Sequence, residues 1–250
     1  MDSILEPFLL SLIAGMTTGL GGIIVLMLRR VGDRVVSASM GLASGVMLMV
    51  AFNNLFLEAE KLLAHVGLVV VFSLGAVVMI ILDLSIPTLN WQLGGWTARK
   101  QKCAGPGLLI AIGVTLHNIP EGFVVAAGYT YMPGLGLVIA IAIMLHNIPE
   151  GVATAIPFRK AGTKPWKIAI VTLLSGLAEP IAALLGAVAL SAVGIKTVIG
   201  YSLVFAAGVM TYITADELIP VAHEYGYKHT ISVGLLLGIM FALMVDVILS

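Results

Sequence analysis

Charged residues are scarce in this sequence, and their scarcity excludes most classes of soluble protein. Only 10% of the 250 residues are Asp, Glu, Lys or Arg, whereas 60% are hydrophobic and the mean hydropathy is +1.10. An ordinary soluble domain carries about 25% charged residues. Apolar runs long enough to cross a bilayer recur along the whole chain. The composition therefore predicts an all-α, polytopic membrane protein.

Other absences narrow the chemistry. The single cysteine, Cys103, excludes an intramolecular disulfide and a thiolate-rich metal site. The formal net charge is +0, so nothing indicates a nucleic-acid partner. The first residues, MDSILEP, lack the basic segment of a cleavable signal peptide, and we expect the first apolar run to be retained as a span. No P-loop is present, so direct coupling to ATP is unsupported.

Hydropathy predicts about eight transmembrane helices in one domain that covers residues 1–250. The alternation of a membrane β-barrel is absent from the sequence. The short turn YTYMPG joins the fourth and fifth spans, which predicts an antiparallel hairpin. The expected spans are 7–28, 36–58, 66–86, 106–129, 134–157, 167–191, 197–220 and 230–249.

The distribution of Lys and Arg predicts the orientation. All 13 basic residues except Lys61 and Lys196 lie in the odd-numbered loops between spans. Cytoplasmic loops carry an excess of basic residues, so the odd loops are predicted to be cytoplasmic and both termini outside. The short loops and the lack of an organelle signal favour a bacterial plasma (inner) membrane.

The hexapeptide HNIPEG occurs twice, at 117–122 and at 146–151, within the fourth and fifth spans. Residues four apart share one face of a helix, so each repeat places a His one turn from a Glu, with an Asn beside them. The proline in each repeat removes a backbone donor and kinks the helix. The polar residues that the hairpin brings together are His117, Asn118, Glu121, His146, Asn147 and Glu150.

Imidazole, carboxylate and amide groups in this combination indicate a divalent transition-metal ion. The histidines argue against Mg²⁺ and Ca²⁺, and the missing thiolates argue against Cu⁺. Glu179, in the segment SGLAEP of the sixth span, adds a third carboxylate. Three buried carboxylates need compensation by cations, which one or two metal ions would supply. The alternative, that these residues only pack helices together, explains the prolines but not the carboxylates.

These motifs resemble those of the ZIP family of divalent-metal transporters, particularly its bacterial zinc-uptake branch. The matching segments are the two HNIPEG repeats, SGLAEP and DELIP at 216–220. The resemblance implies an inverted repeat of three helices on each side of the central pair, a metal site between helices 4, 5 and 6, alternating access, and a homodimer. It also implies one ion at His117, Glu121, His146 and Glu150, and a second at Asn118, Asn147 and Glu179 that shares Glu121 and Glu150.

The chain departs from the family pattern in two places. Many relatives carry a glutamate in the second span where this sequence has Asn54, and many have a histidine-rich loop between spans three and four, which has no histidine here. Further residues are predicted to line the pathway, Asp246 at its entrance and the others within it or at its exit: Met47, Asn54, Asp216, Glu217 and His223.

The predicted function is uptake of a divalent metal ion, namely zinc or iron, manganese, cobalt or cadmium, into the cytoplasm. The protein is predicted not to be an enzyme and to use no cofactor other than the transported ion, with the lipid bilayer as its surroundings. A metal-selective channel remains an alternative. An intramembrane metallohydrolase is less well supported. A zinc protease of the HExxH type needs two histidines four residues apart, whereas in both HNIPEG repeats the residue four after the His is a Glu.

Overall fold

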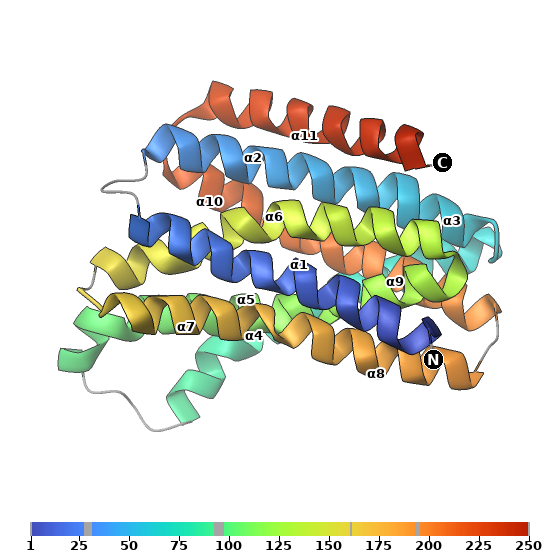
Figure 1. Cartoon of the computed structure of the whole chain (residues 1–250), viewed down its shortest axis with the longest axis horizontal. Helices are drawn as coiled ribbons and strands as arrows, with labels where there is room; N and C mark the ends of the chain where they lie inside the picture. The colour runs from blue at the N-terminus through green and yellow to red at the C-terminus, as the bar shows by residue number, and fades with distance from the viewer. Residues whose placement is uncertain (1, 28–31, 93–97, 161, 194–195, 250) are drawn as a thin grey trace.

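Long helices, roughly parallel to the long axis of the molecule, make up the structure (Figure 1). A computed structural model describes residues 2–27, 32–92, 98–160, 162–193 and 196–249. Within these segments the description leaves out the side chains of residues 2, 83, 86–92, 98–114, 157, 160, 193, 217, 221 and 249. Every regular element in the described segments is a helix, which confirms the predicted all-α class.

The helices follow the chain in a simple order. The first half contains α1 (Asp2–Met27), α2 (Asp33–Met49), the π-helix η1 (Val50–Phe56), α3 (Leu57–Glu60), α4 (His65–Gln92) and α5 (Ala98–Tyr131). The second half contains α6 (Pro133–Lys160), α7 (Pro165–Gly176), α8 (Ala178–Val193), α9 (Lys196–Ile213), the π-helix η2 (Thr214–Leu218), α10 (Ile219–Glu224) and α11 (Lys228–Leu249).

Seven helical stretches in the described part of the chain are long and apolar enough to cross a membrane. They are Ser3–Met27, Asp33–Glu60, His65–Leu82, Pro133–Ile156, Pro165–Ala192, Lys196–Asp216 and Lys228–Ile248. This finding confirms a multi-pass membrane protein. The remaining predicted span, 106–129, lies within α5, part of which is without described side chains, so the count of eight stays a prediction.

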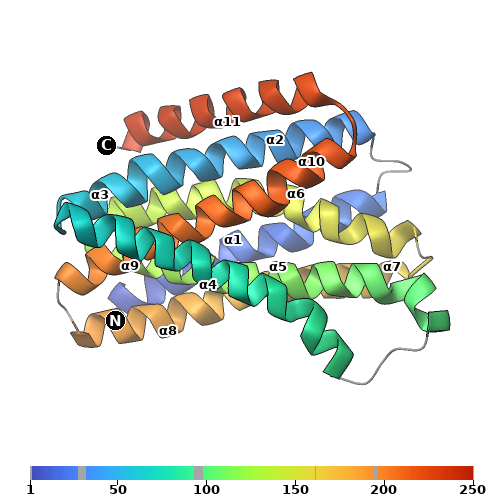
Figure 2. The ribbon, with the colours of Figure 1, turned by 180° about the vertical axis from the view of Figure 1, so that it is seen from behind.

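Two groups of helices can be distinguished by their packing. In the first group α1 packs on α6, α7 and α8, and α5 packs on α6 and α8. In the second group α2 packs on α11, and α4 packs on α9. Figures 1 and 2 show α2 and α11 side by side at one edge of the molecule, and both termini at the same end of the bundle. The shared end agrees with an even number of spans.

Glycine contacts in the second group reveal an inverted repeat. A Cβ on Gly45 of α2 would overlap the carbonyl oxygen of Leu235 in α11, and a Cβ on Gly208 of α9 would overlap that of Phe72 in α4. The two glycines are 163 residues apart in the sequence (208 − 45), and so are the two residues whose carbonyl oxygens they approach (235 − 72). A second pair of contacts, Gly75 with Phe205 and Gly238 with Leu42, obeys the same offset. Glycine permits this close approach of helix backbones, and the repetition is what a two-fold axis that relates α2 and α4 to α9 and α11 would produce.

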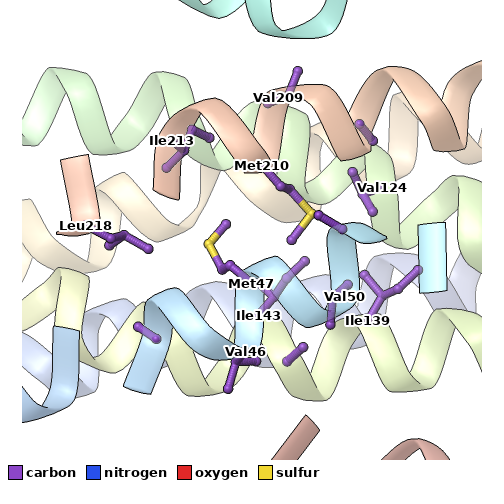
Figure 3. Packing of buried hydrophobic residues seen from close by; sticks show 14 of the residues in the cluster. Val46, Met47, Val50, Val124, Ile139, Ile143, Val209, Met210, Ile213 and Leu218 are labelled. Atoms are coloured by element: carbon purple, nitrogen blue, oxygen red, sulfur yellow. The ribbon is translucent and has the colours of Figure 1, made fainter. Parts of the chain in front are cut away.

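Buried apolar side chains join the two groups. Figure 3 shows Met47 and Val50 near α6 residues Ile139 and Ile143 and near Met210 of α9. All five side chains are at most 1% exposed. Apolar packing without hydrogen bonds lets one group shift against the other without breaking polar contacts in this layer, so the layer is compatible with relative movement.

Candidate metal site

Three side chains converge at the centre of the hairpin formed by α5 and α6. One donor atom from each of Glu121, His146 and Glu150 lies within 4.8 Å of the other two, and all three residues are buried. His146 Nε2 is 2.8 Å from Glu121 Oε1 and 3.9 Å from Glu150 Oε1. Ligand atoms around a tetrahedral zinc ion with bonds of about 2.0 Å are roughly 3.3 Å apart, so little adjustment is needed to enclose an ion.

The backbone of α6 orients the His146 ring. Its Nδ1 lies 3.3 Å from the carbonyl oxygen of Ala142, one turn earlier on the same helix. With the ring proton directed at that carbonyl, Nε2 is the nitrogen that faces the two carboxylates. Metal-binding histidines in proteins are commonly oriented by such a contact of the second ring nitrogen.

The two asparagines are anchored in the same way on opposite sides of the hairpin. Asn118 Nδ2 donates to the carbonyl oxygen of Ser175 in α7 at 2.9 Å, and Asn147 Nδ2 donates to that of Ala14 in α1 at 3.0 Å. Asn147 Nδ2 also donates to Glu179 Oε1, which connects α8 to the site. Because the amide nitrogens are engaged, the amide oxygens are left to accept hydrogen bonds or to bind a cation.

Several buried oxygens at the site have no hydrogen-bond donor among the described residues. They are Asn118 Oδ1, Glu121 Oε2, Asn147 Oδ1 and Glu179 Oε2. A buried acceptor without a partner is costly, and a carboxylate more so, which makes a group of four unusual. All four atoms are hydrogen-bond acceptors, and a bound cation would satisfy them together.

A break in the sixth predicted span puts Glu179 near the start of a helix. The span divides into α7 and α8 at Leu177, and Glu179 falls in the first turn of α8. Pro180 has no N–H, so it cannot continue the ladder to the carbonyl of Gly176. Gly15 of α1 packs against that carbonyl so closely that a Cβ would overlap it. The motif SGLAEP predicts Glu179 as a site residue, but the sequence does not predict the break.

Comparison with known proteins decides the family. The family described as "ZIP Zinc transporter" matches residues 97–247. The chain is 36% identical to a protein of Chlorobaculum parvum, over 99% of this chain and 98% of that one, and 34% identical to a protein of Chlorobium chlorochromatii, over 96% of each. Both relatives are named zinc transporter ZupT. The chain belongs to the ZIP family.

Membership of the ZIP family confirms the resemblance read from the two HNIPEG repeats, and it confirms the prediction that the protein is a transporter rather than an enzyme. The match of the chain with its relatives extends over nearly the full length of each. The resemblance is therefore not confined to the central hairpin.

Not every residue predicted for the ZIP metal site joins the convergent group. His117 is 1% exposed and lies one turn before Glu121 on α5, but it is not among the three residues whose donor atoms converge. The sequence does not predict the backbone acceptors Ala14 and Ser175, nor the hydroxyl of Thr17, which donates to the Met144 carbonyl at 2.9 Å. A backbone acceptor carries no side-chain signal by which a sequence could reveal it.

Two predicted pathway residues, Asn54 and Asp246, contact each other within the second helix group. Asn54 Nδ2, in η1, donates to Asp246 Oδ1 of α11 at 2.7 Å, and Asn53 Nδ2 donates to Asp246 Oδ2 at 3.1 Å. The wide turn of a π-helix lets two consecutive residues reach one carboxylate, and such segments are frequent at functional sites. The amide at position 54 therefore binds a carboxylate from another helix.

The remaining pathway candidates are Met47, Asp216, Glu217 and His223. Met47 is fully buried in the apolar layer between the two helix groups. Asp216 and His223 are exposed, and His223 Nδ1 lies 2.8 Å from the carbonyl oxygen of Ile219. The side chain of Glu217 lies outside the described residues.

Proposed function

We propose that this protein carries a divalent transition-metal ion, zinc foremost, across the membrane into the cytoplasm. The observation that carries the proposal is the convergence of Glu121, His146 and Glu150 within 4.8 Å, beside buried oxygens that have no donor among the described residues. Two bacterial relatives of nearly the same length are named zinc transporters, which supports zinc as the cargo.

Charge balance supports two ions rather than one. Glu121, Glu150 and Glu179 are at most 4% exposed and together contribute a formal charge of −3 when ionised. One divalent ion leaves a net charge of −1 and two leave +1, both far less costly in a low dielectric than −3. The first ion would bind His117, Glu121, His146 and Glu150. The second would bind Asn118, Asn147 and Glu179, with Glu121 and Glu150 as bridges.

Alternating access accounts for the arrangement better than a channel does. Coordination by several buried ligands favours tight binding, whereas conduction requires binding weak enough to release the ion rapidly. The site lies entirely within the first helix group, and apolar side chains join this group to the second. Movement of the first group against the second would expose the ion to each side of the membrane in turn.

The surroundings of the protein follow from the same proposal. The excess of Lys and Arg in the odd-numbered loops supports a cytoplasmic position for these loops and an outside position for both termini, in a plasma (inner) membrane. As the resemblance to the family implies, two copies would assemble as a homodimer, and one helix group would remain static while the other moves.

Proteoliposomes test the function directly. Purified protein is reconstituted with a zinc-sensitive dye inside, and wild type is compared with the double variants His117→Ala/Glu121→Ala and His146→Ala/Glu150→Ala. We expect zinc influx with wild type and none with either variant. His65→Ala is the matched control, because this histidine is the exposed first residue of α4, with its side chain 86% accessible. Binding of zinc without influx by wild type would contradict transport and favour a sensor or an enzyme.

A further inference from the structure

The inverted repeat also relates the helices that build the metal site. Gly122 of α5 and Gly151 of α6 directly follow the glutamates of the two hexapeptides, 29 residues apart (151 − 122). A Cβ on Gly122 would overlap the carbonyl oxygen of Glu179, and a Cβ on Gly151 would overlap that of Thr18. The asparagine anchors repeat the pattern, with Asn118 on the carbonyl of Ser175 and Asn147 on the carbonyl of Ala14.

One offset describes both kinds of contact. Glu179 and Thr18 differ by 161 residues, as do Ser175 and Ala14. The same offset relates Gly176 to Gly15, and these two glycines pack against each other's carbonyl oxygens. A pair of equivalent residues in mutual contact marks the two-fold axis of a repeat. Thr18 is therefore the structural counterpart of Glu179.

The surroundings of Thr18 match this position. Its side chain is fully buried, and its Oγ1 has no hydrogen-bond partner among the described residues. Glu179 accepts a hydrogen bond from Asn147, and the equivalent of Asn147 in the other repeat is Asn118. Asn118 Oδ1 also has no donor among the described residues. Burial of a hydroxyl without a partner is unfavourable, so the oxygen is expected to bind something that the protein chain itself does not supply.

Other buried hydroxyls lack this relation to the site. Ser11 and Thr154 are also fully buried and without a partner in the described part of the chain. The counterpart of Ser11, by the offset of 161 residues, is Thr172, which donates to its own helix backbone. The counterpart of Thr154, by the offset of 29 residues, is Val125, an apolar core residue. Only Thr18 of these three corresponds to a predicted metal ligand.

We infer that Thr18 is a further metal-site residue, whose hydroxyl oxygen faces the ion from α1 as the carboxylate of Glu179 does from α8. The inference rests on the proposed function. A hydroxyl is a neutral oxygen ligand. Thr18 therefore adds a ligand to those of Glu121, Glu150 and Glu179 without adding a fourth negative charge. The site keeps a formal charge of −3, which two divalent ions compensate to +1, whereas four carboxylates would leave it neutral and bind the ions too tightly for release.

Paired substitutions of Thr18 separate a role at the metal from a role in packing. Thr18→Val removes the hydroxyl and keeps the shape, and Thr18→Ser keeps the hydroxyl and loses a methyl group. A neutral hydrogen bond or ligand is worth roughly a three- to tenfold change in affinity, so zinc binding should weaken by that factor in Thr18→Val and recover in Thr18→Ser. Thr154→Val, the same change at an equally buried threonine, should bind zinc as wild type does.

Transfer of the carboxylate gives the decisive readout. Glu179→Ala should weaken binding of zinc, and Thr18→Asp in that background should restore affinity by about tenfold, because it returns a carboxylate to the site from the symmetric side. Thr154→Asp in the same background should restore nothing. Isothermal titration of detergent-purified protein measures affinity and the number of ions bound, and Zn²⁺ itself is the probe.

Each result decides between two readings. Rescue by Thr18→Asp, or a loss in Thr18→Val that Thr18→Ser reverses, supports the inference. Unchanged affinity in Thr18→Val, or equal rescue by Thr154→Asp, overturns it. If the aspartate variants fail to fold, the valine and serine variants still decide. Absence of zinc binding in wild type would instead contradict the proposed function, so the two failures are distinguishable.

Discussion

The two repeats of this protein keep the same backbone contacts but differ in the side chains placed at equivalent positions. Glycines meet carbonyl oxygens at a constant offset in α2, α4, α9 and α11, yet Glu179 corresponds to Thr18. The offset of 163 residues also relates Asn53 and Asn54 of η1 to Asp216 and Glu217 of η2. Helix packing therefore constrains the glycines in both repeats, whereas each end of the pathway is free to adopt its own charge.

The two π-helices differ in the charge of their equivalent side chains. In η1 two amides share the carboxylate of Asp246, whereas the equivalent positions of η2 carry two acidic residues. Under the predicted orientation η1 is nearer the outside and η2 nearer the cytoplasm. Under the proposed function, the π-helix on the cytoplasmic side therefore carries two acidic residues where the π-helix on the outer side carries two amides.

The largest expected effect comes from removal of the bridging carboxylates. Glu121 and Glu150 occupy equivalent positions in the repeat, so Glu121→Ala and Glu150→Ala should each reduce zinc influx by about a hundredfold or more, through the loss of a charged ligand to both ions. Asn118→Ala should cost much less. Influx into proteoliposomes measures this series. Equal losses in all three variants would indicate a site for a single ion.

Next in size is the effect of adding a methyl group to the glycine contacts. Gly122→Ala and Gly151→Ala should each destabilise the protein by about 1–3 kcal/mol, because a Cβ overlaps a backbone carbonyl that cannot rotate away. Thermal unfolding in detergent measures the loss. Gly122→Ala also displaces Glu179, so it should weaken zinc binding more than Gly151→Ala does. A larger loss of binding in Gly151→Ala would reverse the roles given to Glu179 and Thr18.

Acidification should weaken binding of zinc to the central site. A metal-bound imidazole must be neutral and a metal-bound carboxylate deprotonated, so protons compete with the ion and the dissociation constant rises as pH falls. Between about pH 7.5 and 5.5 we expect at least a tenfold rise, since a free histidine titrates in this range. Titration calorimetry at several pH values checks it. A constant affinity over the range would argue against the histidine ligands.

A smaller effect is expected at the pair of π-helices. Asp246→Asn removes the charge that Asn53 and Asn54 bind, and hydrogen bonds between membrane helices are worth about 0.6 kcal/mol on average. The expected loss of stability is about 1 kcal/mol, the sum for two such bonds. Asp216→Asn, at the exposed position of η2 that corresponds to Asn53, is the control and should leave the unfolding temperature unchanged. Equal shifts in both variants would remove the distinction between the two ends.

The smallest effect concerns a polar contact at the end of α3. A hydrogen bond from Lys61 to Glu58, 2.5 Å long, raises the pKa of Lys61. Burial and then the charge of Glu58 raise the pKa of Tyr131 at the end of α5. Glu58→Gln should lower both pKa values, with the shift of Tyr131 only partly reversed because its burial remains. Near-ultraviolet absorbance of tyrosinate during alkaline titration measures it, and an unchanged curve would contradict the contact.

Much of the fold and site could be predicted because the bilayer allows few kinds of secondary structure. Backbone polar groups in hydrocarbon must be satisfied internally, so long apolar runs become helices whatever their packing. Polar residues in such runs are costly and therefore conspicuous, as in the two HNIPEG repeats. Glu121, His146 and Glu150 were identified from spacing alone, and the structure brings them together.

Other features required the packed helices. The break between α7 and α8, the hydrogen bonds of Asn53 and Asn54 to Asp246, and the anchoring of Asn118 and Asn147 on backbone carbonyls all join segments far apart in sequence. Hydropathy measures only how apolar a segment is, and it contains no information about which helix a given face contacts.

Local composition and spacing along one helix were enough to predict the class of protein, most of its spans and the chemistry of the proposed metal ligands. The tertiary structure alone decided which side chains converge, which oxygens remain without donors, and that Thr18 corresponds to Glu179. Those relations arise from contacts between helices, and a contact across 161 residues leaves no periodic signal in a single chain.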